Sequence, residues 1–291
     1  MFLNKNSLTL FTFNASNSHD GLLMAMSTRK GGASQDAFST LNLSFRVDDD
    51  PGAVQANRKN LCEALSVPLE SIVLGQQVHG THVALVTKKD RGKGATSWGD
   101  ALPDTDAMVS NDPDLALMVL AADCAPVFLH DPVKQAIGIA HGSWRGTLGG
   151  IIGKTVARME TAFQCRPEDL RAGIGPSIGP CCYEVGEDLL ATLRHSCPEF
   201  WRECIEEQAS GVIHFNLWET IRRQLLGAGL KPGHVEVAGI CTACHTEIFF
   251  SHRRERGRTG RNGAIIALRH NEGKLSPLNC IESMDHLIIS Q

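Results

Sequence analysis

The sequence predicts an α+β protein in which layered mixed β-sheets are flanked by helices, with a three-layer α/β fold as the alternative. Two observations predict it. Short apolar runs typical of strands recur along the chain, and segments with helical spacing lie between them. The two kinds of segment do not alternate strictly, which favours mixed sheets. No repeat, linker or low-complexity tract divides the chain, so we expect one domain over residues 1–291.

The predicted strands are rich in Val, Ile, Leu or Ala and are bounded by Gly, Pro, Asp or Asn. They cover residues 71–87, 107–110, 115–119, 126–130, 136–141, 235–240 and 263–268. The predicted helices carry apolar residues at helical spacing, giving each one apolar stripe. They cover residues 51–65, 147–163 and 215–227, and the last ends in a Gly stop. The polar segment 88–104 is predicted to be a loop.

Composition excludes several classes of protein. The chain has 28 basic and 32 acidic residues, whereas a general nucleic-acid binder carries a basic surplus. No window approaches the 18 or so apolar residues of a membrane span, and the N-terminus lacks a signal-peptide pattern. We therefore expect a cytoplasmic protein with no nucleic-acid or membrane partner, in which the ten cysteines are reduced.

Three short segments place a potential metal ligand at the end of a predicted strand, beside Gly or Pro. They are GQQVHGT, AADCAP and IAHGSWRG, and the ligands would be His79, Cys124 and His141. Two imidazoles and one thiolate suit Zn²⁺, and three protein ligands leave a fourth position open, as in catalytic sites. Spacing alone is weak evidence, because buried Cys and strand-end His residues are common.

Motifs along nearly the whole chain strengthen this prediction. Besides QVHG, ADCAPV and AHGSWRGT around the three ligands, they include STRKGGAS at residues 27–34, LNL at 41–43, GIGPSIGPCCYEVG at 173–186 and FFSHRRERGRTG at 249–260. In this order they resemble the multicopper polyphenol oxidoreductase, or laccase-like, family, which includes zinc-containing purine nucleoside phosphorylases and a peptidoglycan-editing factor. The sequence departs from the family pattern at Arg46, where members often have His, and at Ser143 within AHGSWRGT.

The resemblance implies that His79, Cys124 and His141 bind the metal. It also implies an enzyme whose partners are a purine nucleoside and phosphate. The reaction would be phosphorolysis of adenosine, inosine or methylthioadenosine to base and sugar-1-phosphate, with adenosine deamination as a possible second reaction. The oligomeric state is not predicted.

Four further residues are candidates for the site. Asp123, next to Cys124, could orient a ligand imidazole or accept a proton, or could simply cap a turn. Arg145 could clamp phosphate or ribose, or could pair with a carboxylate. Gln76 could contact substrate. Arg29 with its following glycines could approach an anion, although a plain turn is the simpler interpretation.

Other cysteines and arginines are given a structural interpretation. Cys241-x-x-Cys244, followed by His, is the strongest rival metal signal, but two buried thiols are the preferred interpretation. The adjacent pair Cys181–Cys182 is expected to pack, since adjacency disfavours shared tetrahedral ligation. A solvated loop explains the arginines of residues 253–261 as well as a phosphate-attracting patch does.

Two alternative functions remain open. Copper-dependent polyphenol oxidation is disfavoured, because no two of the twelve His residues stand two positions apart, as clustered copper sites typically require. A single Cu²⁺ could still occupy the predicted site, since copper competes well for nitrogen and sulfur ligands. A peptidoglycan-precursor editing amidase is the other alternative, with either zinc or Cys124 paired with His141 or His79 performing hydrolysis.

Overall fold

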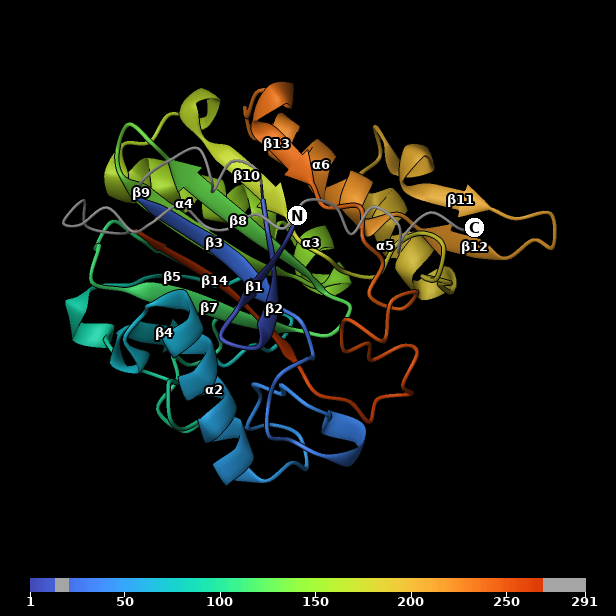
Figure 1. Ribbon diagram of the computed structural model, residues 1–291. Helices are drawn as coiled ribbons and strands as arrows, with labels where there is room; N and C mark the ends of the chain where they lie inside the picture. The colour runs from blue at the N-terminus through green and yellow to red at the C-terminus, as the bar shows by residue number, and fades with distance from the viewer. Residues whose placement is uncertain (14–20, 269–291) are drawn as a thin grey trace.

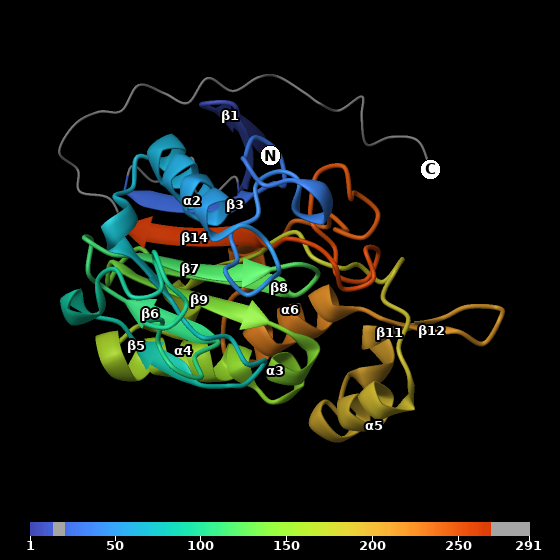
Figure 2. The same ribbon diagram turned by 90° about the horizontal axis from the view of Figure 1, so that it is seen from below.

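The computed structural model describes residues 1–13 and 21–268. Two six-stranded sheets pack face to face and helices cover their outer faces (Figures 1 and 2). The first sheet has the spatial order β1 (Phe2–Lys5), β2 (Leu8–Thr12), β3 (Leu22–Ser27), β14 (Asn262–Leu268), β7 (Ala116–Ala121) and β4 (Ile72–Leu74). The second has the order β13 (Val235–Val237), β10 (Arg171–Ile174), β8 (Ala125–Asp131), β9 (Ala136–Gly142), β6 (Ala107–Ser110) and β5 (Val83–Leu85).

Both sheets are mixed. The pairs β4–β7, β5–β6 and β10–β13 are parallel, and the remaining neighbours are antiparallel. The helices are α2 (Pro51–Leu65), α3 (Trp144–Leu148), α4 (Ile151–Phe163), α5 (Glu187–Ser196) and α6 (Leu217–Gly227). A hairpin of β11 (Ile205–Glu207) and β12 (Ile213–Phe215) lies beside α5 (Figure 2). Short 3-10 helices occur at Asp36–Phe38, Leu69–Ser71, Lys88–Asp90, Pro167–Asp169, Trp201–Cys204 and Pro232–His234. No helix of the described residues is long and apolar enough to span a membrane.

The central strands are buried on both faces, which explains their continuous apolar sequences. In β9, Ile137 and Ile139 face the core between the two sheets, whereas Ala136 and Ala140 face α4 and α6. On the far side of the first sheet, residues such as Ile265 pack against α2. The chain thus forms four layers, helix, sheet, sheet and helix, rather than the three-layer alternative. The predicted α+β class with layered mixed sheets is confirmed.

The predicted helix 51–65 is confirmed as α2, because the Asp50 side chain accepts the Ala53 N–H and caps its first turn. The predicted helix 147–163 is instead two helices. Ser143 caps α3 by accepting the Gly146 N–H, and the chain breaks at Gly150, whose φ of 88° ends the continuity before α4. The predicted helix 215–227 begins at Leu217, because Phe215 belongs to β12.

The long predicted strand 71–87 was wrong in its middle. The structure has β4 and β5 there, in different sheets, with residues 75–82 crossing from one sheet to the other. A Cβ on Gly75 would lie 2.2 Å from the Thr105 carbonyl oxygen, so only glycine allows this departure from the sheet. The sequence prediction also missed β1, β2, β3 and β10, and it made β13 three residues too long.

Candidate active site

His79, Cys124 and His141 converge, as predicted. His79 lies in the β4–β5 crossing, Cys124 in the turn between β7 and β8, and His141 on β9. One potential ligand atom from each lies within 4.8 Å of the others. The two imidazole ring centroids are 5.1 Å apart. Residues 45 and 17 positions apart in the sequence therefore form one cluster.

Their convergence follows from the crossing points between the sheets. β7 belongs to the first sheet and β8 to the second, so residues 122–124 pass from one to the other. Asp123 takes a φ of 85°, which aims this turn. β8 pairs with β9 so that Pro126 lies opposite His141, two residues from Cys124. His79 also has a left-handed backbone, with a φ of 61°. Such non-glycine conformations concentrate at functional sites, where the surroundings hold them.

The carboxylate of Asp106 fixes the backbone around His79. The sequence did not lead us to predict this residue. Its buried carboxylate accepts the backbone N–H groups of Val78, His79 and Gly80 at 2.8–3.0 Å. The same carboxylate accepts Nδ1–H of His141 at 2.9 Å. Because a carboxylate only accepts, this bond fixes the tautomer of His141 and leaves Nε2 free for a metal. Its position immediately before β6, beside a predicted strand end, was the only signal in the sequence.

Charge is concentrated in this cluster. Burial alone would raise the pKa of the Cys124 thiol, but the charge of His141 and hydrogen bonds with His141 and His79 lower it below its ordinary value. Burial opposes protonation of His141, yet Cys124 and Asp106 together raise its pKa. Hydrogen bonds likewise lower the pKa of Asp106 despite its burial. The site therefore favours a thiolate, the form in which cysteine binds metals.

The three residues fit a zinc ion. With Zn–N bonds of about 2.0 Å and Zn–S bonds of about 2.3 Å, a tetrahedral zinc ion separates its ligand atoms by roughly 3.3 to 3.8 Å. The observed separations within 4.8 Å need only small side-chain adjustments to reach that geometry. The donor set of two nitrogens and one sulfur, with His141 oriented by a carboxylate, matches an open catalytic zinc site.

The cluster lies in a cavity of about 840 Å³. Four arginines from three segments of the chain line it: Arg46, Arg145, and the two residues Arg253 and Arg261 of one loop. Three aromatic side chains also line it: Trp98, Trp144 and Tyr183. The cavity thus combines a cluster that could hold a metal ion, positive charge and flat apolar surfaces, which suits a ligand carrying both an anionic group and an aromatic ring.

Two of the predicted supporting residues lie in the cavity. Arg145 is in the first turn of α3, where its guanidinium lies 4.3 Å from the centre of the Trp144 ring. Asp123 is buried at the cavity wall, and its carboxylate accepts the Thr242 hydroxyl at 2.7 Å and the Arg253 N–H at 2.6 Å. The imidazole partner predicted for Asp123 is therefore wrong: Asp106 orients His141, while Asp123 joins the β7–β8 turn to the loops carrying Thr242 and Arg253.

Two other candidate residues, Gln76 and Arg29, are not among the residues that line the cavity. Gln76 does not line the cavity, and its amide donates to the Trp98 carbonyl; its neighbour Gln77 lines the cavity instead. The guanidinium of Arg29 is used structurally. It donates to the Thr246 carbonyl and forms a 2.9 Å ion pair with Glu255. Whether Gln76 or Gln77 faces the cavity depends on the backbone conformation of this segment. The sequence alone did not predict that conformation.

The arginine-rich loop at residues 253–261 and the cysteines outside the active-site cluster also differ from the structural roles expected from the sequence. Arg253 and Arg261 line the cavity, so part of this loop is not merely solvated. Arg46, whose role was in doubt, lines it too. Residues Cys181, Cys182, Cys241 and Cys244 form a second group whose sulfur atoms lie within 4.8 Å of one another. Cys244 is exposed rather than buried.

Comparison with known proteins agrees with this geometry. The family model described as "Multi-copper polyphenol oxidoreductase laccase" matches residues 23–269. The purine nucleoside phosphorylase YlmD of Geobacillus stearothermophilus is 40% identical over 86% of this chain and 91% of its own length. A protein of the same name from Bacillus subtilis is 34% identical over 85% of this chain and 89% of its own.

A solved structure shares the fold. The crystal structure of a Bacillus licheniformis hypothetical protein, YfiH, superposes with a TM-score of 0.87 at 35% sequence identity, covering 92% of this chain and 99% of that one. The matched region, residues 23–269, contains every strand after β2 except the first residue of β3, together with His79, Cys124 and His141. The chain therefore belongs to the multi-copper polyphenol oxidoreductase laccase family.

Proposed function

We propose that this protein is a zinc-dependent purine nucleoside phosphorylase. The observation that carries the proposal is the position of His79, Cys124 and His141 in one cavity with four arginines. Its relatives at 34–40% identity bear the name purine nucleoside phosphorylase, which supports the same reaction class. A purine nucleoside offers an aromatic base, and phosphate offers the anion that guanidinium groups bind well.

Each set of residues has a defined part in the proposal. His79, Cys124 and His141 would hold the zinc ion, which supplies Lewis-acid polarisation of a bound oxygen. Arg145 and Arg261, which both line the cavity, would bind phosphate. The pKa of Arg261 is lowered by burial, although the charge of Cys124 raises it. In this proposal the two arginines would hold phosphate as the nucleophile that attacks the sugar carbon and displaces the base.

The aromatic side chains would bind the base. Trp144, Trp98 and Tyr183 offer faces for stacking on a purine. Adenosine, inosine and methylthioadenosine share this base class, and the cavity of about 840 Å³ exceeds the volume that a nucleoside with phosphate needs. A second proposed activity is deamination of adenosine at the same zinc site, which uses water rather than phosphate.

The test is product analysis of the zinc-loaded protein with adenosine, with and without phosphate. Adenine and ribose-1-phosphate that form only with phosphate would support phosphorolysis, and inosine in both reactions would support deamination. Cys124→Ser should abolish both. The matched control is Arg258→Ala, because Arg258 is exposed on the same arginine-rich loop but does not line the cavity. Unchanged adenosine with zinc-loaded protein would refute the proposal.

A specific arrangement favours an amide hydrolase as a second candidate. Cys124, His141 and Asp106 are linked by hydrogen bonds in the order of a nucleophile, a base and an orienting carboxylate. Such a thiol could cleave an amide bond, for example in a peptidoglycan precursor, without metal. Hydrolysis that persists in metal-stripped protein and disappears in Cys124→Ser would favour this candidate over zinc chemistry.

Zinc is proposed over copper from the donor groups. Within residues 1–13 and 21–268, sets of three or more neighbouring metal-binding side chains occur at two places, and each set surrounds one point. A coupled copper cluster needs several neighbouring ion positions with many imidazoles. We therefore propose that phenol oxidation occurs only when a single Cu²⁺ replaces zinc. Metal analysis of protein from cells grown without added copper would test this.

A further inference from the structure

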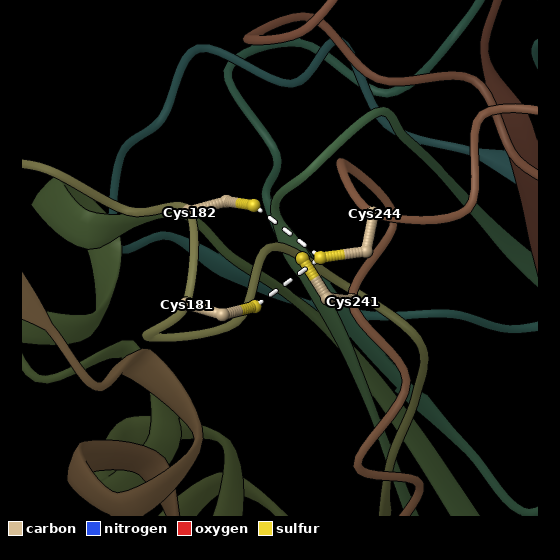
Figure 3. A group of neighbouring side chains, drawn as sticks. All are labelled: Cys181, Cys182, Cys241 and Cys244. Carbon is tan, nitrogen blue, oxygen red and sulfur yellow. Dashed lines mark hydrogen bonds between the residues drawn. The ribbon is translucent and has the colours of Figure 1, made fainter. Parts of the chain in front are cut away.

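Four cysteines outside the active site converge from two segments of the chain. Cys181 and Cys182 lie in the Gly/Pro-rich segment after β10, and Cys241 and Cys244 lie in the segment after β13 (Figure 3). The Sγ atom of Cys244 is 3.4 Å from that of Cys181 and 3.4 Å from that of Cys182. All four sulfur atoms lie within 4.8 Å of one another.

The backbone explains how adjacent cysteines can point to the same place. In an extended strand, the side chains of Cys181 and Cys182 would point in opposite directions. Here both lie in a turn, because the N–H groups of Cys182 and Tyr183 each donate to the Gly179 carbonyl. The turn directs both sulfur atoms toward Cys244 (Figure 3). Adjacency was expected to disfavour shared tetrahedral ligation, but in this turn it does not keep the two sulfur atoms apart.

The distances fit a metal site and not a disulfide. Two sulfur atoms in a disulfide are about 2.05 Å apart. Tetrahedral zinc with Zn–S bonds of about 2.3 Å separates its sulfur ligands by roughly 3.8 Å. The closest separations here, 3.4 Å, are near the second value, and all four cysteines are free thiols.

The surroundings suit thiolates bound to a cation. The Gly179 N–H donates to Cys241 Sγ at 3.2 Å, a bond that stabilises sulfur carrying negative charge. Arg254 lies close by, with its Nε–H donating to the Ala243 carbonyl between the two cysteines of the second segment. We propose that Cys181, Cys182, Cys241 and Cys244 bind a second zinc ion as a tetrathiolate.

The proposed site is structural. Four protein ligands close the tetrahedral shell and leave no position for a substrate. The two segments already meet at a single β-bridge between Ser177 and Cys241. A zinc ion would join the two segments further, in addition to this bridge and the hydrogen bond from Gly179 N–H to Cys241 Sγ. Tyr183 follows Cys182 directly and lines that cavity.

The test is zinc content in protein purified anaerobically from cells grown with zinc. Wild-type protein should contain about two zinc ions per chain, by the two ligand sets. Cys124→Ser should retain one, and X-ray absorption of that remaining zinc should show four sulfur neighbours at about 2.3 Å and no nitrogen. This measurement is made on a variant in which the four cysteines are intact. Its result does not depend on which reaction the cavity performs.

The complementary variant removes the second site. Cys181→Ser combined with Cys244→Ser changes two exposed thiols and should also retain one zinc, now with nitrogen neighbours. Cys62→Ala is the matched control, a cysteine of α2 outside both sets, and should retain both ions. Zinc-free Cys124→Ser protein, nitrogen neighbours around its zinc, or a disulfide involving Cys244 in the anaerobic wild-type protein would overturn the proposal.

Discussion

Replacing Asp106 by Asn should weaken the active site without changing any proposed metal ligand. Each carboxylate oxygen of Asp106 accepts two hydrogen bonds. Oδ1 accepts His79 N–H and His141 Nδ1–H, and Oδ2 accepts Val78 N–H and Gly80 N–H. An asparagine has one such oxygen, so two N–H donors would face an NH₂ group whichever way the amide turned.

Two magnitudes follow from this geometry. Loss of an orienting carboxylate typically weakens metal binding about 10- to 100-fold, which corresponds to about 1.4 to 2.7 kcal/mol. Two unsatisfied N–H groups would destabilise the fold by roughly 2 to 4 kcal/mol, the lower part of the range for two buried donors, because Gly80 is only partly buried and Val78 is exposed.

The assay is zinc competition against a chromophoric chelator, paired with urea unfolding of the metal-free protein. Asp104→Asn is the matched control: Asp104 is exposed, lies two residues away and has a left-handed backbone that asparagine tolerates. The control should match wild type in both measurements. A zinc dissociation constant for Asp106→Asn within twofold of wild type would refute the claim that this carboxylate orients His141.

Three further predictions test the cavity and the fold. Arg145→Ala should raise the KM for phosphate at least about 10-fold, the loss of one charged hydrogen bond; an unchanged KM would remove Arg145 from the phosphate site. In metal-free protein, the thiolate absorbance that Cys124→Ser removes should titrate below the ordinary cysteine pKa of about 8.5, because His141 and His79 lower it; titration at or above that value would contradict this. Arg58→Met should cost about 2 to 4 kcal/mol in urea unfolding, since buried Arg58 donates to three carbonyls that methionine leaves unsatisfied; a wild-type midpoint would contradict it.

Residue type and local context indicated the trio only weakly, and its role as a metal site stays a prediction that rests on the resemblance. His79, Cys124 and His141 each stand beside Gly or Pro near the end of an apolar run, and those runs became the strands that bring them together. Their roles were also implied by resemblance. The sequence also predicted strands at β7, β8 and β9, because both faces of these strands are buried and their sequences are therefore continuously apolar.

Features that depend on pairing between distant segments were not predictable in this way. Asp106 becomes the partner of His141 because β6 pairs with β9, placing Ala107 opposite Ala140. The four cavity arginines come from three segments, with Arg253 and Arg261 in one loop, so no local pattern marks all four as a group. Short polar-flanked strands such as β1 and β10 carry little periodicity of their own and form because neighbouring strands pair with them.

Residues that line the cavity differ in how readily they can be substituted, because some lie at the crossings between the two sheets and others lie on loops. Two residues of the proposed metal site, His79 and Cys124, sit where the chain passes from one sheet to the other, and His141 lies on β9, so a substitution in this cluster can disturb both sheets. The arginines and aromatic residues are carried largely by loops and by the short helix α3. A protein built this way can acquire a new substrate preference through changes at the cavity rim, while the residues of the proposed metal site stay constrained by the stability of the whole fold.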